Sequence, residues 1–280
     1  MTDDKILEYF AKYIYDHTGI MYTDTNFYQL ERRLQSLCTR FDAKDFAELR
    51  LMYSQNKTSE MHQLLVDLAT NNETSFYRDG HPFKVLADEI IPSILVNNKD
   101  SKTLNIWSAG CSMGQEPYSI LMILEEQFPE LKSWRVQLNA TDISTVALDK
   151  TESGVYTQLE VQRGLPIKKL MQYFTQIEDG SYQVKDFIKK NLTVKPFNLF
   201  TDTNGISQFD IVFCRNVLIY QNVENKKKII QNLTNSLKPG GCLFLGNGES
   251  LIGIDSELEN ERHEKVTVFR KPVIGMSKAA

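Results

Sequence analysis

Residues 104–120 read L-N-I-W-S-A-G-C-S-M-G-Q-E-P-Y-S-I and carry the strongest signal for the fold class. Its first four residues predict a short buried strand, and a glycine-containing loop over 109–114 follows directly. We expect a helix from Pro117, because proline is tolerated in the first turn of a helix. A strand that leads through such a loop into a helix is typical of α/β sheets that bind ligands at their strand ends.

The same order of strand and helix continues toward the C-terminus. Strands are expected at 136–142, 209–214 and 242–245, with a helix over about 226–237 and a K-P-G-G turn at 238–241. This alternation predicts an α/β fold with a largely parallel sheet that is covered by helices on both faces. An Asp179-Gly180 turn between apolar residues interrupts it and predicts a small antiparallel insertion over about 170–196.

The N-terminal part of the chain has helical periodicity only. Residues 1–70 carry four sets of apolar residues at helical spacing. A polar break at 71–75 precedes a further helix with Pro82 in its first turn. We therefore expect a helical domain over 1–70 and an α/β domain over 71–280.

Composition excludes several classes of protein. The chain has 280 residues and a formal net charge of −4, which argues against a protein that coats nucleic-acid phosphates. Its four cysteines lie far apart, and this spacing fits neither a zinc site nor a disulfide framework. The sequence has no signal-peptide pattern and no run of about 18 apolar residues. We therefore expect a cytoplasmic protein that binds no metal and does not insert directly into membranes.

The loop and a later acidic residue indicate a nucleotide-like ligand. The glycine-containing loop 110–114 can bring backbone N–H groups close to such a ligand. Asp142 lies 28 residues after Gly114, at the end of the next expected strand, where a carboxylate can accept hydrogen bonds from ribose hydroxyls. The loop lacks the full G-x-G-x-x-G pattern, so these residues alone leave nicotinamide cofactors and S-adenosylmethionine as alternatives.

Three longer strings carry a more specific signal: N-N-E-T-S-F-Y-R (71–78), W-S-A-G-C-S-M-G-Q-E-P-Y-S-I (107–120) and F-D-I-V-F-C-R-N-V-L-I-Y (209–220). Each resembles a motif of the CheR-type chemotaxis receptor methyltransferases, which are protein-glutamate O-methyltransferases. The strings occur in the family's order and spacing, with A-T-D-I-S and K-P-F-N-L-F between them, and the resemblance covers residues 1–271. The departures are Gly110 for alanine, Gln115 for glutamate and Tyr77 for phenylalanine.

The resemblance implies a fold and a cofactor. The fold is a Rossmann-like class I methyltransferase sheet with a small inserted antiparallel β-subdomain, preceded by a small all-α domain. The cofactor is S-adenosylmethionine, which leaves as S-adenosylhomocysteine. Carried over position by position, the cofactor-binding residues are Asn72, Thr74, Arg78, Glu116, Asp142, Asn198, Leu199, Asn216 and Val217.

The implied reaction transfers a methyl group to glutamate side chains of methyl-accepting chemotaxis receptors and gives methyl esters. A glutamate carboxylate, with an ordinary pKa of about 4.3, is ionised at neutral pH, so the reaction needs no general base. We expect Arg78 and Tyr220 to orient this carboxylate and the enzyme to act as a monomer. Two alternatives stay open: a non-catalytic S-adenosylmethionine-binding signalling protein, and a methyltransferase for another protein or a small molecule. A nucleic-acid amino-methyltransferase is disfavoured, because the sequence has no adjacent prolines to form a D-P-P-Y or N-P-P-Y motif.

The helical domain is the expected receptor-docking part of the chain. Residues 25–41 contain Arg32, Arg33 and Arg40 against one glutamate, and the family's methylated receptor regions are acidic helices. The turn at 177–181 is short. We therefore expect that a receptor's C-terminal pentapeptide does not add to this hairpin as an extra strand.

Overall fold

The computed structural model of the chain describes residues 3–201, 203 and 208–273. Four helices form the N-terminal domain, as the periodicity predicts: α1 (Asp3–Thr18), α2 (Phe27–Phe41), α3 (Phe46–Gln55) and α4 (Ser59–Ala69). Their apolar faces enclose one core that includes Phe10, Leu30 and Leu49, each fully buried. The side chain of Thr58 caps α4 by accepting a hydrogen bond from the N–H of Met61 at 3.1 Å.

The arginines of α2 have different environments. Arg32 is exposed, and Arg40 forms a surface ion pair with Glu60. Arg33 is half-buried, and its Nη1 donates to the carbonyl oxygen of Ala69 at 2.7 Å and to the hydroxyl of Tyr22. Arg33 therefore joins α2 to the end of α4, whereas Arg32 and Arg40 stay at the surface of the helix.

The C-terminal domain is built on a seven-stranded sheet with the order β6-β2-β1-β7-β8-β10-β9. The first five of these strands run parallel, and β10 is antiparallel to both β8 and β9. The strands are β1 (Thr103–Ala109), β2 (Arg135–Asp142), β6 (Leu192–Pro196), β7 (Phe209–Cys214), β8 (Leu237–Leu245), β9 (Glu259–His263) and β10 (Val266–Arg270). The parallel sheet confirms the predicted α/β fold.

Alternate residues of the central strands pack against helices on opposite faces. Leu104 and Ile106 of β1 lie in the core beneath α7 (Gln115–Gln127) and beneath a run of three consecutive helices. These are α5 (His81–Val85), the π-helical turn η1 (Leu86–Ile90) and α6 (Ile91–Asn97). Trp107 and Ala109 lie in the second core, against α12 (Val223–Ser236). Burial of one such large side chain contributes about 1.5–3 kcal/mol, so both faces stabilise the sheet.

One local prediction in this sheet was wrong. Residues 238–241, expected as a turn, lie within β8. Gly240 has a φ of 78°, its N–H donates to the carbonyl of Lys271 at 2.9 Å, and the pairing of β7 with β8 shifts register between Phe209 and Ile211. The chain therefore bends through a bulge and stays paired instead of turning.

A second, three-stranded antiparallel sheet confirms the predicted insertion. Its order is β3-β5-β4, and the hairpin of β4 (Phe174–Gln176) and β5 (Tyr182–Val184) turns through Gly180 at a φ of 83°. Its third strand, β3 (Val155–Tyr156), comes before the expected range of 170–196, whereas β6, within that range, pairs with β2 of the large sheet. The neighbouring helices are α8 (Thr145–Ser153), α9 (Gln158–Gln162), α10 (Ile167–Tyr173) and α11 (Asp186–Lys189), and the short 3₁₀ helices are η2 (Pro129–Ser133) and η3 (Leu218–Tyr220).

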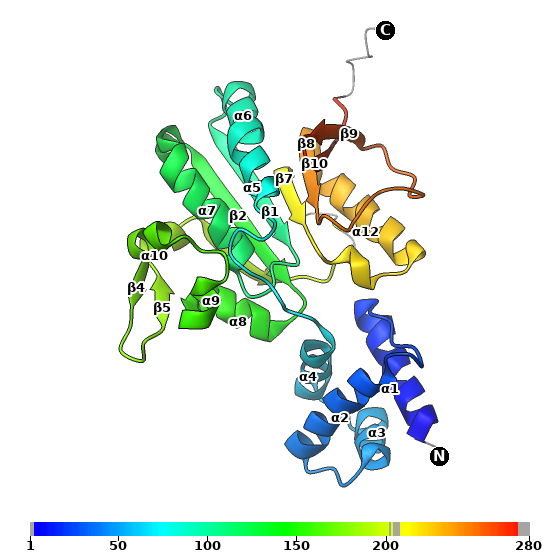
Figure 1. Cartoon of the computed structure of the whole chain (residues 1–280). Coiled ribbons are helices and arrows are strands. Elements are labelled where there is room, and N and C mark those ends of the chain that lie inside the picture. The colour runs from blue at the N-terminus through cyan, green and yellow to red at the C-terminus, as the bar shows by residue number, and fades with distance from the viewer. Residues whose placement is uncertain (1–2, 202, 204–207, 274–280) are drawn as a thin grey trace.

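The helical domain lies below the α/β domain in the view of Figure 1, with α1 near the chain that follows β7 and α4 near α8. Asp67 of α4 accepts hydrogen bonds from the N–H and the hydroxyl of Thr145, both at 2.8 Å. The side-chain amide of Asn222 donates to the hydroxyl of Tyr15 at 2.8 Å. None of the helices within the described ranges is both long and apolar enough to cross a membrane.

Candidate functional site

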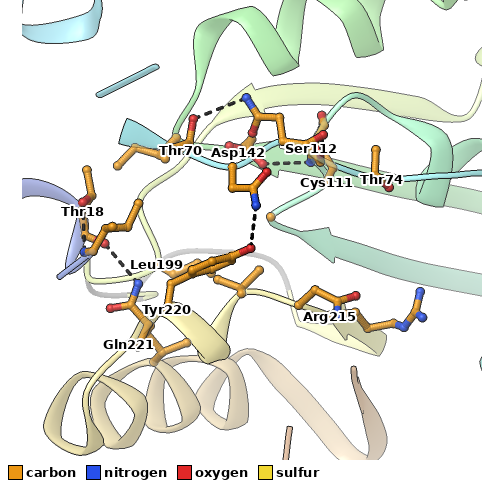
Figure 2. Close-up of a pocket in the computed structure, with 18 of the residues that line it drawn as sticks. Thr18, Thr70, Thr74, Cys111, Ser112, Asp142, Leu199, Arg215, Tyr220 and Gln221 are labelled. Carbon is orange, nitrogen blue, oxygen red and sulfur yellow. Dashed lines mark hydrogen bonds between the residues drawn. The ribbon is translucent and has the colours of Figure 1, made fainter. Parts of the chain in front are cut away.

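A cavity of about 1050 Å³, counting its open mouth, lies where β1, β2 and β7 end. Its wall includes all of the residues that the sequence indicated: Asn72, Thr74, Arg78, Glu116, Asp142, Asn198, Leu199, Asn216, Val217 and Tyr220. Figure 2 shows that the wall also includes Thr18 at the end of α1, beside Thr70 and Thr74 of the linker after α4 and Asp142 at the end of β2. The cavity thus lies between the two domains, at the edge of the sheet where open α/β folds bind ligands.

Asp142 ends β2 and holds the glycine-containing loop. Its Oδ2 accepts a hydrogen bond from the N–H of Ser112 at 2.9 Å, and its Oδ1 accepts one from the N–H of Ser144 at 3.0 Å. Burial raises the pKa of this carboxyl group, while hydrogen bonds from the backbone N–H groups of Ser144, Ser112 and Ile143 act in the opposite direction. Each carboxylate oxygen can accept a further hydrogen bond, so Asp142 can bind ligand hydroxyls while it anchors the loop.

The loop approaches its neighbours closely. Gly110 has a φ of 78°, and a Cβ there would lie 2.6 Å from a methyl carbon of Val217. Ser112 has a φ of 52°, and its hydroxyl donates to the carbonyl oxygen of Asn72 at 2.8 Å. Gly110 therefore leaves room at the cavity wall, and Ser112 joins the loop to the linker between the domains.

Glu116 and Arg215 form a buried charge network at one end of the cavity. Glu116 is in the first turn of α7, and its carboxylate accepts hydrogen bonds from the hydroxyl of Ser108 at 2.8 Å and from Nη1 of Arg215 at 3.0 Å. Nη2 of Arg215 donates to Oδ2 of Asp79 at 2.7 Å and to the carbonyl of Arg78 at 2.9 Å. The Arg215 side chain is only 2% exposed. Glu116 is thus held in place before any ligand binds.

The carboxylate of Glu249 fixes the conformation of the chain after β7. Asn216 has a φ of 60°, in the left-handed region. Four backbone N–H groups donate to Glu249: those of Gly246 at 2.7 Å, Asn216 at 2.8 Å, Leu218 at 2.7 Å and Ile219 at 3.3 Å. This one side chain therefore fixes the backbone that carries Asn216, Val217 and Tyr220.

Arg78 and Tyr220 lie at the wall nearest to the linker. Nη1 of Arg78 donates to the carbonyl oxygen of Glu73 at 2.9 Å, and the Tyr220 hydroxyl accepts from the side-chain amide of Asn71 at 2.9 Å. Tyr220 remains 38% exposed. In Figure 2 the Tyr220 ring points toward the residues around Asp142. A guanidinium group and a hydroxyl thus line a part of the cavity that solvent reaches.

The end of α1 forms a further wall, with Thr18 and Ile20. The side-chain amide of Asn198 donates to the carbonyl of His17 at 2.8 Å, and that of Gln221 donates to the carbonyl of Thr18 at 3.3 Å. The Asn198 amide group thus binds the end of α1. Its neighbour Leu199 is buried and, with Val217, supplies apolar surface to the cavity.

All four cysteines are buried: Cys38, Cys111, Cys214 and Cys242. Cys111 belongs to the cavity wall. Burial raises the pKa of each thiol, that of Cys242 to about 12. A thiolate nucleophile is therefore disfavoured at this site.

Sequence reasoning did not identify Arg215, Glu249 or Ser112 as functional. Arg215 stands inside the string C-R-N-V, and an arginine directly after an apolar strand is a signal for a buried ion pair. Glu249 follows β8 in G-N-G-E-S, at the carboxyl end of a parallel strand. Thr18 and Ile20 carry no signal in the sequence, because their place in the wall depends on how the two domains meet.

The residues present fit S-adenosylmethionine. Asp142 offers acceptors for ribose hydroxyls, Glu116 offers a carboxylate for a cationic amino group, and apolar side chains such as Ile143 and Phe197 offer a surface for a base.

Comparisons with known proteins identify the family of the chain. Residues 72–267 match the family described as CheR methyltransferase, SAM binding domain, and residues 5–70 match CheR methyltransferase, all-alpha domain. A chemotaxis protein methyltransferase of Vibrio parahaemolyticus is 39% identical over 93% of this chain and 94% of that protein. Chemotaxis protein methyltransferase 1 of Vibrio cholerae is 36% identical over the same shares, and Cher2 of Pseudomonas putida is 37% identical over 88% and 90%. The chain therefore belongs to the CheR methyltransferase family and carries both of its domains, the all-alpha one and the one that binds S-adenosylmethionine.

Proposed function

We propose that the protein transfers a methyl group from S-adenosylmethionine to glutamate side chains of methyl-accepting chemotaxis receptors in the cytoplasm, and so forms methyl esters. One observation carries this proposal. The cavity wall combines the cation of Arg78 with the hydroxyl of Tyr220, whereas the described residues that line it include no histidine and no lysine. Such a wall suits an acceptor that is already anionic and needs no general base.

The reaction depends on orientation. A glutamate side chain, with an ordinary pKa of about 4.3, arrives as a carboxylate. S-adenosylmethionine supplies an electrophilic methyl group when bound. The guanidinium of Arg78 attracts the carboxylate, and the Tyr220 hydroxyl can donate to one oxygen, so that the other oxygen is free to attack in line. Glu116 and Asp142 hold the cofactor at both ends and thereby fix the position of the reacting carbon.

Exclusion of water adds to the effect. The attraction between a carboxylate and the sulfonium of the cofactor is stronger where water is absent. Ile20 of the helical domain and Phe197 of the α/β domain both line the cavity and offer apolar surface from its two sides. The helical domain therefore contributes to the site itself, and the exposed side of α2, with Arg32 and Arg40, is the proposed contact for acidic receptor helices.

Radiolabelled methyl transfer to receptor-containing membranes tests the proposal. Label that mild base releases as methanol would identify a carboxyl ester, and base-stable label would point to another acceptor chemistry. No transfer, together with normal S-adenosylhomocysteine binding, would support the alternative of a non-catalytic signalling protein.

Two variants test the assigned roles. Arg78→Ala is expected to lower turnover far more than it weakens S-adenosylhomocysteine binding if it holds the acceptor, whereas a parallel loss would assign it to the cofactor's carboxylate. Tyr220→Phe removes one hydroxyl and keeps the ring, so it isolates the orienting hydrogen bond. Wild-type turnover in both variants would remove these residues from the mechanism.

A further inference from the structure

Arg215 is a buried cation that the proposed reaction does not use directly. It contacts three groups that belong to different parts of the chain. Nη1 bonds to Glu116 at the start of α7, while Nη2 bonds to the side chain of Asp79 and to the carbonyl of Arg78. Its guanidinium carbon also lies 5.5 Å from the centre of the Phe83 ring. One planar group thus joins the cofactor side of the cavity to the segment that carries Arg78.

That segment needs to be held. Tyr77 and Asp79 have φ values of 50° and 68°, in the left-handed region that residues other than glycine rarely adopt, and Gly80 has a φ of 62°. A bulky residue such as Tyr77 is strained in this region unless its surroundings compensate. The N–H of Tyr77 donates to the hydroxyl of Ser119 at 3.0 Å, and Arg215 binds the two residues that follow. The strained turn places Arg78 between these two anchors.

We propose that Arg215 is a positioning residue for methyl transfer: it sets the distance between Glu116, on the cofactor side, and the turn that presents Arg78 to the acceptor. This inference rests on the proposed function. A lysine cannot do the same, because a single ammonium group lacks the planar fork that reaches both sides at once. The guanidinium group of Arg215 therefore couples the placement of the cofactor, through Glu116, to the placement of the acceptor, through Arg78.

Asp79→Asn gives the cleanest test. Asp79 does not belong to the cavity wall, and asparagine tolerates the left-handed region as aspartate does. We expect the turnover number to fall about five- to tenfold, while the dissociation constant of S-adenosylhomocysteine and the KM for receptor stay within about twofold. Turnover is expressed per calorimetrically counted S-adenosylhomocysteine site, so that misfolded protein does not contribute. Asp88→Asn, which removes the surface ion pair with Lys84, is the matched control and is expected to change neither quantity.

Arg215→Lys and the double variant that combines it with Asp79→Asn complete a double-mutant cycle. We expect Arg215→Lys to lower both turnover and cofactor affinity, and Asp79→Asn to have little further effect on turnover in that background. Wild-type turnover in Asp79→Asn, or full additivity in the double variant, would overturn the proposal. If Arg215→Lys does not fold, the comparison of Asp79→Asn with Asp88→Asn still decides the outcome.

Hydrogen exchange separates this proposal from the proposed function. In the S-adenosylhomocysteine complex, the amides of 77–80 are expected to exchange faster in Asp79→Asn than in the wild type, with no change in Asp88→Asn. Faster exchange in Asp79→Asn, together with a wild-type protein that methylates no receptor, would keep the positioning role and reject the acceptor. Unchanged exchange would reject the positioning role whatever the acceptor is.

Discussion

The floor and the cover of the cavity are built from different interactions. At the floor, the carboxylates of Asp142 and Glu249 each accept hydrogen bonds from several backbone N–H groups, and Arg215 bridges two carboxylates. At the cover, the end of α1 is held through the neutral amides of Asn198, Gln221 and Asn222. The floor therefore uses charged partners, whereas the α1 side of the cover uses uncharged ones.

This difference has an energetic consequence. Hydrogen bonds to ionised groups are roughly twice as strong as neutral ones, whose net contribution is about 0.5–1.5 kcal/mol each. We expect the floor to be preformed and the end of α1 to be the first part that moves when the cofactor enters or leaves. Changes at the floor should therefore have large effects on binding, and changes at the cover small ones.

Asp142→Ala is expected to give the largest effect. It removes the ribose acceptor and leaves the N–H groups of Ser112 and Ser144 unpaired. Affinity for S-adenosylhomocysteine should fall about 10- to 100-fold, and the free energy of unfolding by about 1–3 kcal/mol. Calorimetric titration and urea unfolding measure the two quantities. Asp210→Ala is the control, because Asp210 is also buried and bonded but begins β7 at the opposite edge of the sheet; equal affinity losses in both variants would contradict the assignment.

Acidification is expected to weaken binding at a higher pH than for an ordinary aspartate. Burial raises the pKa of Asp142, so this carboxylate takes up a proton while exposed carboxylates are still ionised. The protonated group is a poorer acceptor, and affinity should fall as the pH decreases through the raised pKa. Titrations with S-adenosylhomocysteine at stepped pH measure the midpoint. Asp142→Asn does not titrate, so a remaining dependence of the same size would assign the effect to another group.

Glu249→Gln tests the floor beneath Tyr220. The amide keeps the size of the side chain but places an NH₂ group against N–H donors. We expect about a tenfold loss of turnover, and a loss of stability of about 1–3 kcal/mol, as for other buried polar groups left without a partner. Glu224→Gln, at an exposed position in the first turn of α12, is the control. Unchanged turnover in Glu249→Gln would mean that the loop holds its shape without this carboxylate.

Reversed charges on α2 separate docking from folding within the helical domain. Arg32→Glu changes an exposed side chain and is expected to slow receptor methylation about two- to fivefold with stability unchanged, as for a charge at an interface rim. Arg33→Glu loses the bond to Ala69 and places an unpaired carboxylate beside Tyr22, so it should lower the unfolding temperature. Equal methylation rates in Arg32→Glu and the wild type would exclude this surface from docking.

Tyr15→Phe is expected to give the smallest effect. It removes only the hydroxyl that accepts from Asn222 at the cover. Because one neutral hydrogen bond contributes about 0.5–1.5 kcal/mol and Tyr15 does not line the cavity, only the lower part of this range should reach the ligand, and affinity for S-adenosylhomocysteine should weaken only about two- to threefold. Tyr28→Phe, on the exposed side of α2, is the matched control. A loss as large as that of Asp142→Ala would contradict the distinction between floor and cover.

The order of elements and the edge that bears the cavity could be predicted from sequence. Apolar strands alternating with helices specify a parallel sheet, and parallel strands bring their carboxyl ends to one edge. The charge network could not be predicted, because Arg215 lies 99 residues from Glu116 and 136 from Asp79, and no local periodicity relates them. The hairpin of β9 and β10 was also not predicted from the sequence, because β9 is a charged edge strand with little apolar alternation.

The rate at which each buried thiol is alkylated measures how often the structure around it opens. An alkylating reagent reacts with a thiolate, and each cysteine here is both shielded and kept protonated by its surroundings. Labelling at Cys38 therefore times the opening of the helical domain, and labelling at Cys242 times the opening of the sheet. The rate at Cys111 measures the opening of the glycine-containing loop, and its half-life with and without S-adenosylhomocysteine reports ligand occupancy without an engineered label.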